Sequence, residues 1–120
     1  MVRNEDGFTL IELIVAATVF TVGLLALLGA NLLVYQLLDA GHRATTASFY
    51  ARERTETLRG ISCSAVAGGS ETRGAGYQLA WAVQPAYGGS ARRLQLLITY
   101  PARPGRLRTD TVETSVLCVQ

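Results

Sequence analysis

The sequence contains little that could carry out catalysis or hold a metal ion. Its 120 residues include no lysine, one histidine and two cysteines, and the cysteines form no CxxC or Cys/His pattern with metal-ligand spacing. The single histidine, His42, has no serine, cysteine or carboxylate partner at a recognisable spacing, so we interpret it as a surface residue. We expect neither an enzyme nor a binder of metals or cofactors.

Charge is also scarce, and it is unevenly distributed. Only 17% of the residues are charged whereas 49% are hydrophobic, which excludes a disordered chain. The eleven arginines are dispersed without a run of five or six, so we interpret them mainly as a solvated surface; a nucleic-acid-binding face is the alternative. No charge occurs between Leu13 and Leu38, and all but four of the 20 charged residues follow Leu38.

The uncharged run from Leu13 to Leu38 is long enough to cross a membrane. Its 26 residues would form a helix of about 39 Å, and some 20 apolar residues span a bilayer. A cleavable secretory signal has a shorter apolar stretch that ends in an Ala-x-Ala site, which is missing here. The run therefore predicts a transmembrane helix.

Glu12 does not fit an ordinary membrane anchor. It lies four residues inside an apolar run that begins at Phe8, directly after Gly7. A carboxylate in hydrocarbon is costly unless it is paired, so such a residue indicates a function. The alternative is a position among the lipid headgroups, where no partner is needed.

The segment from Gly7 to Ala16, GFTLIELIVA, resembles the cleavage motif of type IV prepilins and pseudopilins. The resemblance implies that a prepilin peptidase cuts between Gly7 and Phe8, that Phe8 is then N-methylated, and that Glu12 pairs with the N-terminus of a neighbouring subunit during assembly. The close match covers residues 7–30. The leader departs from the usual basic pattern, because it holds Glu5 and Asp6 beside Arg3.

The same resemblance sets the orientation of the chain in the membrane. One arginine precedes the apolar run and three follow it by Arg54, which by the positive-inside rule would weakly place the C-terminal part inside. We follow the family orientation, because the cleavage motif is the more specific signal. The resemblance thus implies an inner-membrane protein with its C-terminal module in the periplasm, and afterwards a periplasmic or cell-surface fibre.

Helical spacing continues beyond the apolar run and ends near Arg59, directly before Gly60. Small and apolar residues recur at intervals of three and four, which predicts one buried helix face. They are Leu37, Ala40, Ala44, Ala47, Ala51, Thr55 and Leu58. A single helix from about Phe8 to Arg59 is therefore expected, with a membrane-spanning half and an amphipathic half.

The remaining residues predict a loop and three strands. Residues 60–76 hold five glycines, including the pair Gly68-Gly69, and are expected to form a loop. Apolar residues then alternate with polar ones in 77–84, 94–100 and 112–118, with turn residues in Pro85–Arg92 and Pro101–Arg108, as in an antiparallel meander. The predicted fold class is α+β: one long N-terminal helix packed on a small antiparallel sheet.

We expect three segments: a leader peptide of residues 1–7, a transmembrane and assembly helix of residues 8–38, and a pilin-like module of residues 39–120. The module contains both cysteines, Cys63 and Cys118, which lie 55 residues apart. In an oxidising compartment we expect them to form a disulfide; two reduced buried cysteines are the alternative.

The preferred function is that of a minor pilin or pseudopilin in a type IV pilus-like or type II secretion fibre. The partners implied are the prepilin peptidase, other pilin or pseudopilin subunits, the inner-membrane assembly platform and the membrane itself. One alternative is a DNA-uptake pseudopilin or a binding subunit at the fibre tip, with DNA as a further partner. A second alternative is an uncleaved protein anchored by a single span.

Overall fold

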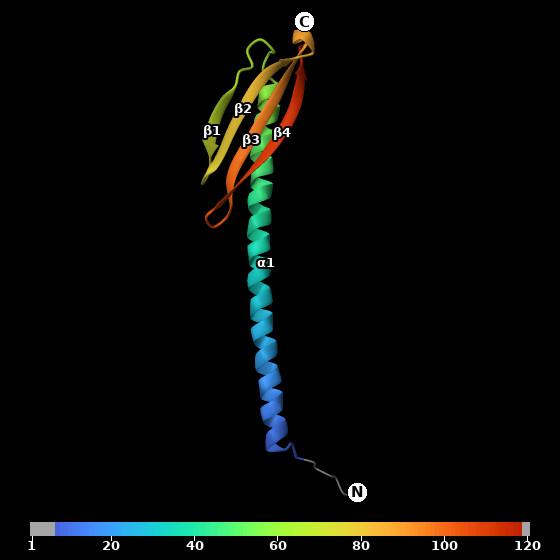
Figure 1. Cartoon of the computed structure of the whole chain (residues 1–120), viewed down its shortest axis with the longest axis vertical. Coiled ribbons are helices and arrows are strands. Elements are labelled where there is room, and N and C mark those ends of the chain that lie inside the picture. Colours follow the sequence, from blue (N-terminus) through green and yellow to red (C-terminus); the bar gives the residue numbers. More distant parts are fainter. Residues whose placement is uncertain (1–6, 119–120) are drawn as a thin grey trace. The chain divides into compact units, whose positions relative to one another are not determined.

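The computed structural model describes residues 7–118; residues 1–6, which make up most of the expected leader peptide, and residues 119–120 lie outside the described part. The chain divides into two units, one up to Leu38 and one from Asp39 onward. Helix α1, Leu10–Arg59, contributes to both (Figure 1). It ends at the predicted residue and begins two residues later than predicted.

The described part of the first unit is the exposed, apolar portion of α1. Every residue from Gly7 to Leu38 is exposed, including the large apolar side chains all around the helix. Among the described residues, α1 is the one helix whose length and composition would let it cross a membrane. A helix that is apolar on all sides is stable in lipid or against other helices rather than in water.

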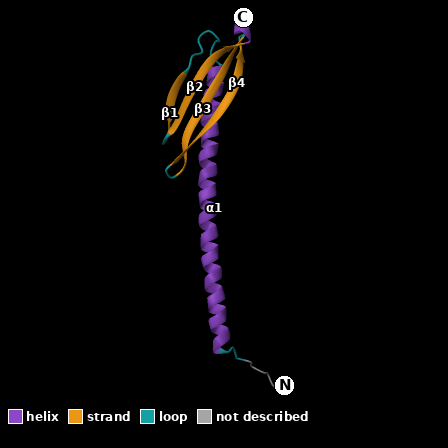
Figure 2. Ribbon diagram, in the orientation of Figure 1, coloured by secondary structure: helices purple, strands orange, loops and turns teal. Residues whose placement is uncertain are grey.

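The second unit contains the remainder of α1 and a four-stranded sheet (Figure 2). The strands are β1 (Gly69–Arg73), β2 (Tyr77–Ala86), β3 (Ala91–Arg103) and β4 (Arg106–Leu117). They lie in the order β1-β2-β3-β4 and every neighbouring pair is antiparallel, so the sheet is a meander. The 3-10 turn η1 (Tyr87–Gly89) joins β2 to β3.

One face of the sheet packs on the small-residue face of α1. Ala47, Ala51 and Leu58 are buried in one apolar cluster with residues of β2 and β3, namely Leu79, Trp81, Leu94, Leu96, Ile98 and Tyr100. Alanines at the helix surface let the sheet approach closely and leave the large side chains to the strands. This arrangement confirms the predicted α+β class and the phases of the first two predicted strands.

The prediction of a loop over residues 60–76 was wrong in part, because Gly69–Arg73 forms β1. Gly69 is paired with Trp81, and a Cβ at Gly69 would lie only 2.8 Å from an indole carbon of that residue. Glycine here permits a close approach of backbone to ring instead of marking a turn. Gly74 and Gly76, both with positive φ, make the turn that follows the strand.

Ion pairs hold β1 against the helix. Arg73 Nη1 lies 2.7 Å from Glu53 Oε2 of α1, and Arg73 Nε lies 3.0 Å from Glu71 Oε1. Glu71 also pairs with Arg54, whose guanidinium carbon lies 4.2 Å from the centroid of the Trp81 ring. The side chains that β1 turns towards α1 are therefore charged. A search for alternating apolar residues does not detect such a strand.

Two prolines that we had placed in turns lie within strands. Pro85 is in the last part of β2, beyond Trp81, where β1 no longer pairs with that strand. Pro101 is in β3 next to an irregularity of register between Pro101 and Arg103. Proline lacks the N–H that a sheet needs, so strands accept it at free edges and at bulges.

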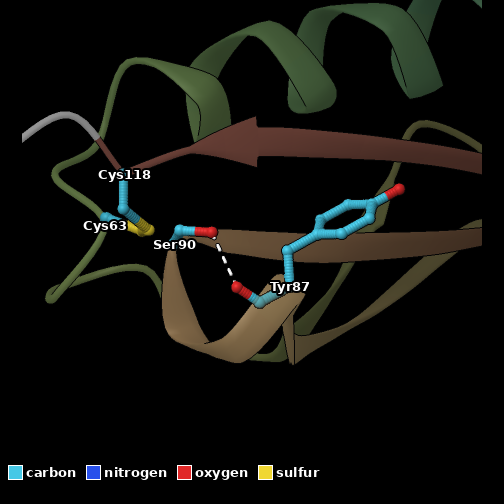
Figure 3. Close-up of a disulfide and its surroundings, with 4 residues drawn as sticks. All are labelled: Cys63, Tyr87, Ser90 and Cys118. Atoms are coloured by element: carbon cyan, nitrogen blue, oxygen red, sulfur yellow. Dashed lines mark hydrogen bonds between the residues drawn. A yellow bond between two sulfur atoms is a disulfide. The ribbon is translucent and has the colours of Figure 1, made fainter.

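The Cys63 and Cys118 sulfurs are joined in a disulfide, between Cα atoms 5.4 Å apart (Figure 3). The bond links the loop that follows α1 to the end of β4. The backbone N–H of Cys118 also donates to the carbonyl of Ser90, 2.9 Å away. Three separate segments therefore meet at this end of the sheet.

We expect removal of the disulfide to lower the stability of the second unit strongly. Closing a loop of 55 residues is worth about 4 kcal/mol in the chain-entropy description. Cys63→Ser and Cys118→Ser should cost similar amounts, since either breaks the same bond. Urea unfolding of the full chain in detergent, followed by Trp81 fluorescence, measures the loss. Two free thiols per chain in the denatured, unreduced wild type would contradict the prediction.

Tyr100 carries a buried ring and a bonded hydroxyl. The residue is 1% exposed, and its Oη donates to Asp110 Oδ2 at 2.8 Å. This hydrogen bond, supported by Arg108, lowers the pKa of the Asp110 carboxyl, although partial burial acts in the opposite direction. Burial, followed by the same hydrogen bond, raises the pKa of Tyr100.

Tyr100→Phe is expected to destabilise the second unit in a pH-dependent way. Because Asp110 has a lowered pKa when folded, its contribution is present above the ordinary aspartate pKa, near 3.9, and is lost as the pH falls through the folded value. A half-exposed carboxylate makes the bond worth about 1 kcal/mol near neutral pH. Urea midpoints of wild type and variant should begin to converge as the pH falls below about 4, and they should coincide once the pH is below the folded pKa of Asp110.

Tyr77→Phe is the matched control for this comparison. The Tyr77 ring stacks on Tyr100 at a centroid distance of 5.8 Å, but its hydroxyl has no hydrogen-bond partner among residues 7–118. A pH-independent difference between Tyr100→Phe and wild type would show that the hydroxyl does not act through the Asp110 carboxylate.

Candidate processing and assembly site

The expected cleavage position precedes the first turn of α1. Residues 7–9 have no helical structure, and α1 begins at Leu10. Gly7 is exposed, and apart from its own atoms and its chain neighbours no heavy atom of the described residues lies within 4 Å of the place where its Cβ would be; the Phe8 residue is 87% exposed. The peptide bond between Gly7 and Phe8 therefore lies in an open segment that another protein could bind in extended form.

Thr9 and Glu12 form a capping box at the start of α1. The backbone N–H of Thr9 donates to Glu12 Oε2 at 2.9 Å, and Thr9 Oγ1 donates to the same oxygen at 3.0 Å. The backbone N–H of Glu12 in turn approaches Thr9 Oγ1 at 3.3 Å. These bonds satisfy N–H groups that have no partner inside the helix, and they place a negative charge at the positive end of the helix dipole.

This local role of Glu12 was not predicted from the sequence, for which the two expectations were pairing with a neighbouring subunit and a position among the lipid headgroups. The spacing Thr9-x-x-Glu12 before an apolar run is the standard capping-box pattern, from which this capping role could have been predicted. Thr9 is therefore a residue of the candidate site in its own right. In the isolated chain it gives the Glu12 carboxylate hydrogen-bond donors that any other partner would have to replace.

The helix surface beside Glu12 is a shallow apolar groove. Glu12 contributes the one charged side chain of its lining, together with Ile11, Val15, Ala16, Val19 and Phe20. The spacing of these residues puts them on one side of α1, and all of them are exposed. A second helix that packed here would cover apolar side chains and meet one carboxylate at the end of the groove.

His42, Cys63 and Cys118 are the other side chains that the sequence analysis weighed for catalysis or metal binding. His42 is exposed on α1. Among residues 7–118, no group of three or more histidine, cysteine, aspartate or glutamate side chains could hold a metal ion. Cys63 and Cys118 are bonded to each other.

Comparison with known proteins identifies the N-terminal segment. Residues 2–28 match the family model for the prokaryotic N-terminal methylation motif. No curated protein and no solved structure matches the chain. The matched segment includes Gly7, Phe8, Thr9 and Glu12, and its apolar part forms the beginning of α1 and of the membrane-length apolar run. Residues 2–28 therefore match the prokaryotic N-terminal methylation motif, the class III signal peptide of type IV pilins, on a chain with an α+β fold.

Proposed function

We propose that this protein is a minor pilin or pseudopilin, a structural subunit of a type IV pilus-like or type II secretion fibre. The observation that carries the proposal is the methylation motif at residues 2–28, joined to a helix that is long and apolar enough to cross a membrane. The motif implies processing by a prepilin peptidase and assembly with other pilins.

In this proposal the leader is residues 1–7, and the peptidase cuts between Gly7 and Phe8. Phe8 becomes the N-methylated N-terminus, residues 8–38 form the membrane and assembly helix, and residues 39–120 form the module outside the membrane, in the periplasm. The open backbone of residues 7–9 suits binding by a peptidase, because an extended substrate does not first have to be unfolded.

Assembly removes the helix from lipid and places it among other helices. Cleavage creates an ammonium group on Phe8, which the core of a helical bundle does not tolerate unpaired. The Glu12 carboxylate of an adjacent subunit supplies the opposite charge, and the pair fixes the axial register of one subunit against the next. The exposed apolar surface of α1 and the groove beside Glu12 support this step, since helix partners would cover both.

The small size of the second unit and the glycine-rich loop that precedes its sheet favour a minor role. The inner-membrane assembly platform and other pilins are the partners in this proposal.

Quantitative mass spectrometry of fibres sheared from cells tests the proposal. We expect the chain in the fibre fraction, starting at Phe8, in much smaller amounts than another pilin subunit. An amount equal to the most abundant subunit would make it the major subunit. A chain that keeps Met1 and stays in the membrane fraction would instead be a single-span anchored protein. Deleting the assembly ATPase of each fibre system in turn identifies the machine.

A further inference from the structure

The turn between β3 and β4 carries an unusual concentration of positive charge. We call residues 101–108 the basic hairpin; it contains Arg103, Arg106 and Arg108, and every residue from Arg103 to Arg108 is exposed. Pro104 and Gly105 form its tip, and Gly105 has φ of 72°, as a type II turn requires at its third position. The tip is therefore a tight turn that holds the arginines in defined places.

Two of these arginines lie directly opposite each other. Arg103 and Arg106 are partners in the register of β3 and β4. Like charges in facing positions destabilise a sheet. Within residues 7–118 neither arginine has an ion-pair partner, whereas Arg108 is paired with Asp110 at 2.9 Å. An anion bound between Arg103 and Arg106 would remove this repulsion.

A hollow of suitable size lies beside these side chains. Its volume is about 280 Å³, and it is bounded by Arg103, Arg106 and Arg108 on one side and by Ala40 and Ala44 of α1 on another. The small alanine side chains leave space between helix and hairpin, and no carboxylate contributes to the lining. Guanidinium groups bind phosphate oxygens through paired N–H donors, so a phosphate group is the ligand that this lining fits.

The position of the hollow along the chain indicates the source of the phosphate. Ala40 and Ala44 come two and six residues after Leu38, the end of the membrane-length apolar run, which corresponds to at most about 9 Å along a helix. Arg43, between them, donates from Nη1 to the Pro101 carbonyl at 3.2 Å, so it fixes the hairpin to this turn of α1. Leu107, next to the arginines, is 73% exposed.

We propose that the basic hairpin binds the phosphate groups of anionic phospholipids at the surface of the membrane in which α1 is anchored. Arg103 and Arg106 would contact the headgroups while Leu107 enters the interface, the combination by which basic and apolar side chains bind together to anionic bilayers. A nucleic acid would use the arginines but not the exposed leucine. The contact holds the second unit to the bilayer until the subunit leaves it.

The test uses the full-length chain in lipid nanodiscs and a tryptophan probe in place of Leu107 (L107W). The nanodiscs contain either phosphatidylcholine alone or three parts phosphatidylcholine to one part phosphatidylglycerol, and acrylamide quenching reports exposure of the probe. We expect phosphatidylglycerol to shield the probe in L107W. A probe at the other end of β4 (S115W) should be quenched equally in both lipids. Trp81, which is 9% exposed, gives the same background in each.

Adding R103Q/R106Q should lower the equilibrium constant between shielded and exposed hairpin by about 30-fold, since each arginine near an anionic surface contributes roughly fivefold. The matched control is R52Q/R93Q, which removes two exposed arginines from elsewhere on the second unit and should leave shielding intact. R103K/R106K keeps the charge and should retain most of the shielding. Should R103Q/R106Q fail to fold, as judged by Trp81 emission, the lipid dependence of L107W alone decides.

Equal quenching of L107W in both lipids would overturn the proposal, as would an equal loss of shielding in R52Q/R93Q or a complete loss in R103K/R106K. Shielding by inorganic phosphate or by a short DNA duplex in phosphatidylcholine discs, without an effect of phosphatidylglycerol, would overturn the lipid as the source. The inference rests on the membrane anchoring in the proposed function but not on processing or assembly. Its failure therefore leaves the proposed function standing, and an unprocessed chain still tests it.

Discussion

A chain with Gly7→Val is expected to retain all 120 residues in cells whose prepilin peptidase shortens the wild type by seven. In the proposed function the scissile bond follows Gly7, and we expect the peptidase not to accept a branched side chain at that position. Because no heavy atom of the described residues beyond the chain neighbours lies within 4 Å of the Cβ position of Gly7, valine meets no obstacle in that part of the chain. A loss of processing would therefore report the requirement of the peptidase and not misfolding.

Gly23→Val is the matched control for this experiment. It makes the same change within α1, at a position where no described residue beyond the local helix backbone and the chain neighbours comes within 4 Å of the Cβ. It lies inside the matched motif but away from the proposed cleavage position. Intact-mass measurement of both variants should give a full-length Gly7→Val chain and a Gly23→Val chain that starts at Phe8. A Gly7→Val chain that starts at Phe8 would show that the peptidase does not require glycine before the scissile bond.

Much of the second unit could be predicted because its apolar residues follow simple periods. The intervals of three and four among Ala47, Ala51 and Leu58 mark the buried face of the helix, and the alternation around Leu79 and Leu96 marks the buried face of the sheet. Each pattern has to face an apolar partner, so a helix packed on a sheet follows from the two together.

The features that were missed depend on contacts between residues distant in sequence. β1 contains glycine, serine, threonine and charged residues, and it is held by Arg73 to Glu53 of α1 and by the approach of Gly69 to Trp81. Neither contact leaves a periodic signal. Pro101 is tolerated because the register is irregular beside it, a property of the β3–β4 pair and not of the proline alone.

The functional residues also fall into those that could be predicted from the sequence and those that could not. Gly7, Phe8 and Glu12 could be named because a short motif contains them, and the capping box of Thr9 and Glu12 could also have been found, since both residues lie within one turn. The hollow beside Arg103 and Arg106 could not be found from the sequence. The hollow forms because the register of β3 and β4 places these two arginines opposite each other, and because the fold places Ala40 of α1 in the same lining.

Glu12→Ala is expected to reduce incorporation of the chain into fibres by roughly a hundredfold while leaving the amount in the membrane unchanged or higher. An apolar side chain suits hydrocarbon better than a carboxylate, so insertion does not suffer. In the fibre, however, the Phe8 ammonium of the adjacent subunit would lose its partner, and an unpaired buried charge strongly opposes assembly. Immunoblots of sheared fibres, normalised to the membrane fraction, measure the ratio.

Glu12→Gln separates the two roles of this side chain. Glutamine at the third helical position keeps a carbonyl oxygen that can accept from the Thr9 N–H, so the capping box persists while the charge is removed. If pairing with the neighbouring N-terminus is what assembly needs, Glu12→Gln should be lost from fibres nearly as completely as Glu12→Ala. If Glu12→Gln assembles like the wild type while Glu12→Ala does not, helix capping by Thr9 and Glu12 is the requirement, and the charge pair proposed between subunits is wrong.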